Sequence, residues 1–280
     1  MSKLALGTVQ FGLEYGISNT NGQVSLEEAR KILKLAKEND IDTLDTASSY
    51  GNSESVLGEI GVDEFQIVTK TTPLQLGVTN VLQSFQRSLS DLNISSVDGL
   101  LIHNIDDIKD KQFNSLYKEL DKLKQNKLIN KIGFSTYTSE QVDFVLNNFD
   151  FDLIQIPFNV FDTRLVDGGQ LQSLKNQHIE IHARSIFLQG LLLDFKNLSD
   201  YFSKWTNQFN IYQETVRDSN LSLLEYALNF ALNTKEIDKV LVGVDSVVQL
   251  SNIVSSFKAN TNLKSFGIND IKLLNPSLWR

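Results

Sequence analysis

Residues 97–103 read VDGLLIH, a short run in which apolar residues occupy consecutive positions and a polar residue comes last. Runs of this type recur along the 280 residues, at 4–7, 41–47, 65–70, 97–103, 131–135, 153–159, 179–185 and 239–244. Because their apolar residues do not alternate with polar ones, the runs are typical of parallel strands that are covered on both faces. Each run therefore predicts one strand of a parallel sheet.

Helical patterns separate these runs. Ser25 and Glu28 have the spacing of a capping box, and the apolar residues of 26–36 then recur every three or four positions. Thr138 and Ser222 begin similar stretches. Alternating strands and helices over this length predict an α/β fold, a single-domain (β/α)8 TIM barrel over residues 1–280. A doubly wound open sheet is the alternative, but no G-x-G-x-x-G turn follows the first run.

The stretch 186–220 interrupts this alternation. It is a long connection after the seventh predicted strand and is rich in aromatic residues. Since the active sites of barrels are built from the loops that follow strands, we expect a long loop with some helix that covers a site. An extra helix packed on the barrel wall is the alternative.

The composition excludes several classes of function. Lys and Arg number 26 against 34 Asp and Glu, and the net charge of −8 argues against general binding to nucleic acid or to anionic membranes. With no cysteine, the chain has no disulfide and no thiolate nucleophile. The first residues lack an apolar leader, and no apolar run is long enough to span a bilayer, so we predict a cytoplasmic protein.

Two other patterns predict no site. His178 and His182 lie four residues apart but lack the glutamate of a zinc motif, so we predict no metal. Four lysines are interpreted as the solvated face of a helix end: Lys122, Lys124, Lys127 and Lys131.

Ionisable residues end three of the predicted strands: Asp45, Lys70 and His103. In a parallel barrel the carboxyl ends of all strands meet on one rim, so we expect these side chains to converge. Tyr50 follows in the loop after Asp45, and a neighbouring Lys⁺ would lower the pKa of its phenol. Such a group can give a proton to a carbonyl oxygen as hydride arrives at the carbon. A structural ion pair between Asp45 and Lys70 is the alternative.

These residues resemble a known family. The motif D-T-A-x-x-Y-G-x-x-E at 45–54, the lysine that ends the third run and the histidine that ends VDGLLIH are similar to those of the aldo-keto reductases. The resemblance extends over essentially the whole chain. It implies a (β/α)8 barrel that reduces aldehydes or ketones with NAD(P)H. It also implies that Tyr50 is the general acid, that Lys70 and Asp45 tune it, and that His103 orients the substrate.

The resemblance also implies where the cofactor binds. Ser135 and Gln155 match positions that hold the nicotinamide carboxamide, and the segment from Ser185 to Leu191 matches a loop along the pyrophosphate. A polar residue inside an apolar strand needs a partner, so a hydrogen bond within the barrel is the alternative role of Gln155. The cofactor-binding residues implied in this way are Ser135, Gln155, Arg184, Ser185, Phe187, Leu188, Gly190, Gly243, Asp245, Gln249 and Asn252.

Two departures from the family pattern concern the cofactor. Arg184 stands where many members have an aromatic residue that stacks on the nicotinamide, which indicates an anionic or sugar-like substrate or an ion pair with a rim carboxylate. After the eighth predicted strand, Gly243 and Gln249 stand where Lys or Arg usually meets the 2′-phosphate of NADPH, with Asp245 between them. The resemblance implies NADPH as the cofactor, whereas these three residues favour NADH. The alternative role of Asp245 is to stabilise the N-terminus of a helix.

Three functions are weighed. The first is an NAD(P)H-dependent reductase of a small carbonyl compound, with Tyr15, Asn159 and Arg184 as candidate substrate residues. The opening GTVQFGLEYGI at 7–17 resembles bacterial members associated with sugar metabolism, so we expect a sugar-derived substrate and a monomer or small homo-oligomer. A nucleotide-sensing protein on the same barrel with little turnover is the second. A glycosidase-like hydrolase that uses Asp42 and Asp45 is the third, although on a strand these residues face opposite sides.

Overall fold

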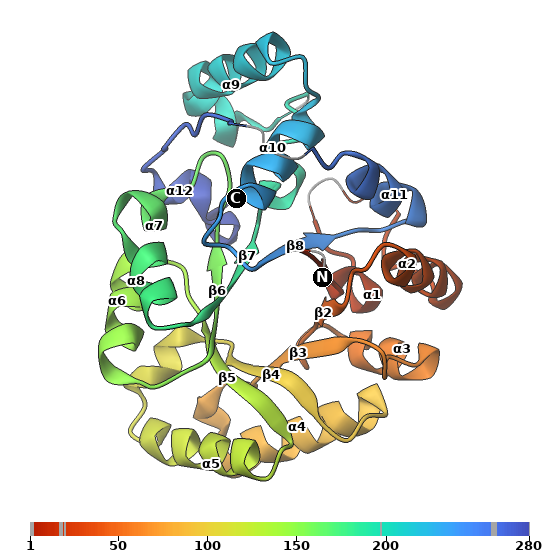
Figure 1. Ribbon diagram of the computed structural model, residues 1–280, viewed down its shortest axis with the longest axis vertical. Helices are drawn as coiled ribbons and strands as arrows, with labels where there is room; N and C mark the ends of the chain where they lie inside the picture. Colours follow the sequence, from red (N-terminus) through yellow and green to blue (C-terminus); the bar gives the residue numbers. More distant parts are fainter. Residues whose placement is uncertain (1–2, 17–18, 20, 197, 259–261, 280) are drawn as a thin grey trace.

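The computed structural model describes residues 3–16, 19, 21–196, 198–258 and 262–279, and it contains a closed parallel barrel in which each strand pairs with the next and β8 pairs with β1 (Figure 1). The strands are β1 Leu4–Gly7, β2 Thr43–Asp45, β3 Gln66–Lys70, β4 Val97–Ile102, β5 Ile129–Ser135, β6 Leu153–Pro157, β7 Glu180–Arg184 and β8 Lys239–Gly243. The predicted (β/α)8 barrel is confirmed, since all the predicted strands are present in order.

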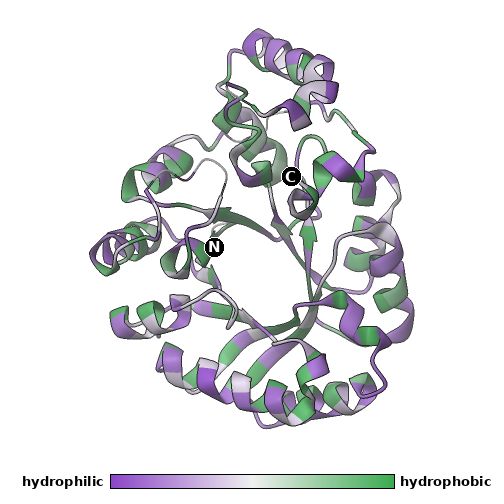
Figure 2. Ribbon diagram, turned by 180° about the vertical axis from the view of Figure 1, so that it is seen from behind, coloured by the Kyte–Doolittle hydropathy of each residue, from purple (hydrophilic) through white to green (hydrophobic). Residues whose placement is uncertain are grey.

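Helices surround the barrel. The α-helices are α1 Val9–Gly12, α2 Leu26–Glu38, α3 Ser53–Ile60, α4 Val78–Leu92, α5 Phe113–Gln125, α6 Ser139–Asn148, α7 Arg164–Asp167, α8 Gln170–Asn176, α9 Thr206–Asp218, α10 Leu223–Leu232, α11 Val247–Ser255 and α12 Ile271–Leu274. Short 3₁₀ turns are η1 Leu74–Leu76, η2 Ile105–Lys109, η3 Leu188–Gly190, η4 Asp200–Trp205 and η5 Pro276–Leu278. The barrel and these helices enclose the main core, and hydrophobic residues lie mostly on strands and on inward helix faces (Figure 2).

The helix starts show one departure from the predicted caps. Thr138 and Ser222 each begin a helix with a complete capping box, as predicted. Ser25 also accepts a hydrogen bond from the backbone N–H of Glu28, at 3.2 Å. The Glu28 carboxylate does not return to Ser25, because it accepts the backbone N–H of Val247 at the start of α11, at 2.7 Å.

Side chains that point into the barrel form three layers. On β7, for example, Ile181 and Ala183 pack outward in the main core, whereas His182 and Arg184 point inward. The middle layer is apolar and consists of Val68, Leu101 and Leu153. A polar network lies below it, and a cavity lies above it at the carboxyl ends of the strands.

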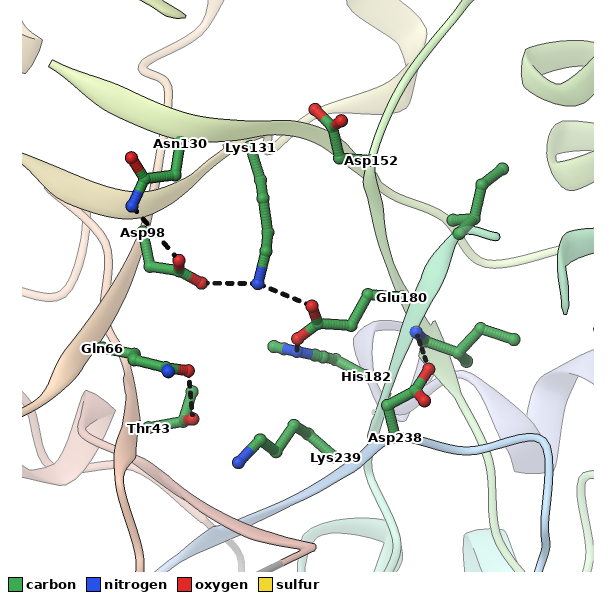
Figure 3. A network of polar contacts seen from close by, with 12 residues as sticks. Thr43, Gln66, Asp98, Asn130, Lys131, Asp152, Glu180, His182, Asp238 and Lys239 are labelled. Carbon is green, nitrogen blue, oxygen red and sulfur yellow. Dashed lines mark hydrogen bonds and ion pairs between the residues drawn. The ribbon is translucent and has the colours of Figure 1, made fainter. Parts of the chain in front are cut away.

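The polar network occupies the N-terminal end of the barrel (Figure 3). Lys131 Nζ lies 2.8 Å from Asp98 and 2.6 Å from Glu180, and His182 Nε2 lies 2.7 Å from the same glutamate. Nearby, Lys239 pairs with Asp42 at 2.5 Å. The interpretation of Lys131 as part of a solvated face was therefore wrong: this lysine belongs to β5 and bridges carboxylates of β4 and β7 across the end of the barrel.

The segment 186–220 has two parts. Its first residues border the cavity, whereas η4 and α9 pack in a second hydrophobic cluster with Tyr226 of α10 and with the C-terminal segment around Leu273. Figure 1 shows α9 at the outer edge of the molecule, beyond α10.

No helix among the described residues has the length and apolar character needed to cross a membrane.

Candidate active site

A cavity of about 620 Å³ opens at the carboxyl ends of the strands. Most of the predicted site residues line it: Tyr15, Asp45, Tyr50, His103, Ser135, Gln155, Arg184, Ser185, Phe187, Gly190, Gly243, Asp245, Gln249 and Asn252. Lys70 is 2% exposed and lies behind Asp45 and Tyr50. The side chains of Leu188 and Asn159 are also buried and do not line the cavity.

A buried ion pair forms the floor of the site. Lys70 Nζ donates to Asp45 Oδ1 at 2.6 Å and to the carbonyl oxygen of Thr46 at 2.8 Å. The second carboxylate oxygen of Asp45 accepts the side-chain amide of Gln155 at 2.7 Å. Because the ammonium and the carboxylate are both paired, their charges are tolerated in a dry environment.

Two glycines set the position of Tyr50. A Cβ atom on Gly12 of α1 would lie 1.7 Å from the carbonyl oxygen of Tyr50, so only glycine allows this close approach. Gly51 has φ 58°, and a Cβ there would lie 2.2 Å from the carbonyl oxygen of Gly12. The turn that carries Tyr50 therefore packs directly on α1, which holds the phenol over the ion pair: Lys70 Nζ lies 4.9 Å from the centre of its ring.

The electrostatics of the site differ from the sequence prediction at Tyr50. Burial raises the pKa of the Tyr50 phenol; the ammonium of Lys70 acts in the predicted, lowering direction but does not outweigh burial. Tyr50 is therefore protonated at neutral pH. Burial and the charge of Lys70 lower the pKa of His103 to about 4, so its imidazole is neutral. The two rings meet edge to face with centroids 6.2 Å apart.

Gln155 has a defined orientation. Because its NH₂ group faces the carboxylate of Asp45, its carbonyl oxygen is the atom left to accept a hydrogen bond from a ligand. The hydrogen bond within the barrel, which the sequence left as an alternative role, is thus present, and it fixes the orientation of the amide. Ser135, its neighbour in the β5–β6 register, is 2% exposed and also lines the cavity.

The loop after β7 has an unusual backbone. Ser185, Leu188 and Gln189 have φ values of 60°, 47° and 54°, which are costly for residues other than glycine and persist only where the surroundings impose them. Asn159 contributes by donating its side-chain amide to the carbonyl oxygen of Ser185 at 3.2 Å. Within the loop, the N–H groups of Leu188 and Gly190 are occupied by carbonyl oxygens.

The end of the cavity near β8 carries negative charge. The Oδ1 atom of Asp245 is buried and has no hydrogen-bond partner among the described residues. The backbone N–H of Asp245 donates to the side-chain oxygen of Gln249 at 3.1 Å. At the first turn of α11, the carboxylate of Glu28 already holds the N–H of Val247. This end of the cavity therefore offers acceptors rather than the cations that a phosphate requires.

Sequence reasoning missed Tyr137 and Glu28. Tyr137 follows β5, lines the cavity and stacks on Arg184, whose Cζ lies 4.2 Å from the centre of the ring. Among the described residues no carboxylate pairs with Arg184, so the predicted alternative of a rim ion pair is wrong. Tyr137 carries no sequence signal, because an aromatic residue after a strand has many roles, whereas Glu28 was expected to complete a capping box with Ser25.

Asp42 and Asp45, the two carboxylates considered for a glycosidase, do not lie together. Asp45 lies at the C-terminal end of β2, whereas Asp42 lies at the opposite end of the barrel and pairs with Lys239.

The sequence and the fold match known proteins. The model of the Aldo/keto reductase family matches residues 3–274. Glyoxal reductase of Bacillus subtilis is 27% identical, over 76% of this chain and 82% of its own length. L-galactose dehydrogenase of Arabidopsis thaliana is 26% identical, over 95% of this chain and 88% of its own length.

Solved structures share the same barrel. The aldo-keto reductase of Bacillus halodurans superposes with a TM-score of 0.74 at 18% identity and covers 92% of this chain and 87% of its own. Glycerol dehydrogenase of Gluconobacter oxydans superposes with a TM-score of 0.71 at 20% identity, over 94% of this chain and 88% of its own. At these identities the likeness concerns the fold.

Proposed function

Because the chain belongs to the aldo/keto reductase family, whose members are oxidoreductases acting on small carbonyl compounds, we propose that it reduces an aldehyde or ketone with Tyr50 as the proton donor. The observation that carries this proposal is the arrangement of Tyr50 above the buried pair of Lys70 and Asp45, at the wall of a cavity. When bound, a reduced nicotinamide supplies the hydride that adds to the carbonyl carbon.

The protein groups then have distinct roles. His103 is neutral and donates a hydrogen bond that orients the carbonyl oxygen toward Tyr50. As charge develops on that oxygen, Tyr50 gives up its proton, and the adjacent ammonium of Lys70 stabilises the phenolate that forms. Asp45 keeps Lys70 in place and compensates its charge, while Thr46 fixes the direction of the ammonium.

The residues of the cavity fit a dinucleotide. The carbonyl oxygen of Gln155 and the hydroxyl of Ser135 are directed to hold a carboxamide, and Gly190 and Gly243 allow close approach of a ligand. The unpartnered Oδ1 of Asp245 suits a ribose hydroxyl, which can donate the hydrogen bond that this buried atom lacks.

We propose NADH as the preferred cofactor. A 2′-phosphate at this end of the cavity would meet the carboxylate of Asp245. Like charges repel, and in this cavity no lysine or arginine lines that end among the described residues. Since relatives of this chain include glyoxal reductase and L-galactose dehydrogenase, a small hydroxylated or sugar-derived carbonyl is the substrate class we favour.

The proposed function is tested by binding and turnover together. Tyr50→Phe is expected to lower kcat/KM by about 10²–10⁴-fold with NADH while leaving its dissociation constant nearly unchanged, because only the proton donor is lost. Fluorescence titration measures the binding and NADH oxidation measures the turnover. Turnover close to wild type in Tyr50→Phe would refute the assignment, and tight binding without reduction of any carbonyl would favour a nucleotide sensor.

The cofactor preference has its own measurement. Titration of the wild type should show about fivefold to tenfold tighter binding of NADH than of NADPH, the size of one like-charge contact near the surface. Asp245→Asn should narrow this ratio by strengthening NADPH binding, whereas Asp218→Asn on the exposed end of α9 should not change it. A wild-type preference for NADPH would contradict the proposal.

A further inference from the structure

Arg184 is a cation in the cavity that the proposed reaction does not use. Its guanidinium lies over the ring of Tyr137, with Cζ 4.2 Å from the ring centre, and Nη2 donates to the carbonyl oxygen of Thr136 at 3.0 Å. Nη1 lies 3.4 Å from Ser185 Oγ, a weak contact. A guanidinium has five N–H donors in a planar fork, so most of them have no protein acceptor among the described residues.

The position of Arg184 places its charge beside the reacting groups. Burial and Lys70 are the main causes of the lowered pKa of His103, and the charge of Arg184 also lowers it. The charge of Arg184 likewise acts to lower the pKa of Tyr50, although burial outweighs it there. The aromatic contact with Tyr137 and the bond to Thr136 hold the fork against the segment that follows β5.

The other charges of the cavity do not satisfy Arg184. Asp45 is already paired with Lys70 and Gln155. Asp245, whose backbone N–H donates to Gln249 of α11, and Asp194, which accepts the backbone N–H of Lys196, form no ion pair with Arg184 among the described residues. Among the described lining residues, Arg184 is the one with a full positive charge, and a half-buried cation without a counter-charge is costly unless a ligand supplies one.

We propose that Arg184 binds the carboxylate of the substrate, so that the natural substrates are aldehydes or ketones that carry a carboxylate group, such as oxo acids and oxidised sugars. The planar fork matches two carboxylate oxygens, and Tyr137 keeps it oriented at little entropic cost. This inference rests on the proposed carbonyl reduction, for which His103 and Tyr50 hold the carbonyl at the other end of the same molecule.

The test compares acids with their methyl esters. Succinic semialdehyde and methyl 4-oxobutanoate form one pair, and 4-carboxybenzaldehyde and methyl 4-formylbenzoate form the other. In wild type, kcat/KM with NADH should be about tenfold or more higher for each acid than for its ester, the size expected for a charge-assisted bidentate contact. Equal reduction of acid and ester would overturn the inference and leave the reductase intact.

Variants assign the preference to Arg184. Arg184→Met should bring the acid-to-ester ratio to about one, and Arg184→Lys should give an intermediate ratio because it keeps the charge without the fork. Arg217→Met, an exposed arginine on α9, should keep the wild-type ratio. A weakened NADH affinity in Arg184→Met with an unchanged ratio would mean that Arg184 serves the cofactor, and would also overturn the inference.

A binding measurement separates this inference from the proposed function. Calorimetry with the Tyr50→Phe protein and NADH should show that succinic semialdehyde binds, that its ester binds at least about tenfold more weakly, and that Arg184→Met in the same background removes the difference. If wild type reduces neither acid nor ester, the proposed reductase is refuted, and equal binding of the two compounds refutes the role of Arg184.

Discussion

At the N-terminal end of the barrel Lys131 and Lys239 each pair with a carboxylate, whereas at the C-terminal end Arg184 and Asp245 line a cavity and form no ion pair among the described residues. Lys131 bridges Asp98 and Glu180, and the three side chains come from neighbouring or nearby strands (Figure 3). At the other end, no described carboxylate pairs with Arg184, and the buried Oδ1 of Asp245 accepts no hydrogen bond.

This difference separates charges that stabilise the protein from charges that await a ligand. His182 also belongs to the paired end: its Nε2 contacts Glu180, and its buried Nδ1 has no hydrogen-bond partner among the described residues. The ion pair of Asp45 and Lys70 is paired like the N-terminal network but borders the cavity, so it should contribute to both stability and turnover.

The largest effect is expected from Lys70→Met. It leaves Asp45 buried with only Gln155 as a partner, so the free energy of unfolding should fall by about 3–5 kcal/mol. It also removes the ammonium that stabilises the phenolate of Tyr50, so kcat/KM should fall by about 10²–10⁴-fold. Urea unfolding and NADH oxidation measure the two losses. A stable variant with full turnover would mean that the pair has neither role.

The matched substitution at the other end is Lys131→Met. It leaves Asp98 and Glu180 facing each other without a cation, and because Lys131 is a quarter exposed we expect a loss of about 3 kcal/mol in the free energy of unfolding. Turnover should stay within about twofold of wild type, since an apolar layer separates this network from the cavity. Adding Glu180→Gln should restore part of the stability. A large loss of kcat/KM in the folded Lys131→Met protein would show that the two ends are coupled.

The sequence predicted one end of the barrel far better than the other. Asp45, Lys70 and His103 each end an apolar run, and topology alone brings such residues to one rim, so their convergence could be predicted. Lys131 lies near the start of β5 and Glu180 begins β7, both at the opposite end. In the chain, Lys131 is 33 residues from Asp98 and 49 residues from Glu180. Nothing local distinguishes such residues from a solvated charge.

Two features of the site also depended on three-dimensional packing. The direction of the Tyr50 pKa was mispredicted because burial, which cannot be read from the spacing of Lys70 and Tyr50, outweighs the ammonium. The carboxylate of Glu28 was expected to cap its own helix but instead caps α11, which becomes its neighbour only through closure of the barrel between β1 and β8. Each error concerns a contact between distant segments.

The smallest predicted effect is the acid sensitivity of the N-terminal network. Burial alone would raise the pKa of Glu180, but the contacts with His182 and Lys131 lower this pKa to about 2. In the unfolded chain the pKa of a glutamate is about 4.3. Because the folded pKa is the lower one, the stabilisation is complete above about pH 4.3 and is lost as the pH falls toward 2. With allowance for partial exposure, Glu180 should account for about 2 kcal/mol of the decline in unfolding free energy over this interval. Glu180→Gln should flatten the pH dependence of the unfolding free energy, measured by urea unfolding between about pH 4.3 and 2. As a control, Glu214→Gln on the exposed face of α9 should leave this pH dependence unchanged. Identical slopes for Glu180→Gln and wild type would place the acid-sensitive contact elsewhere.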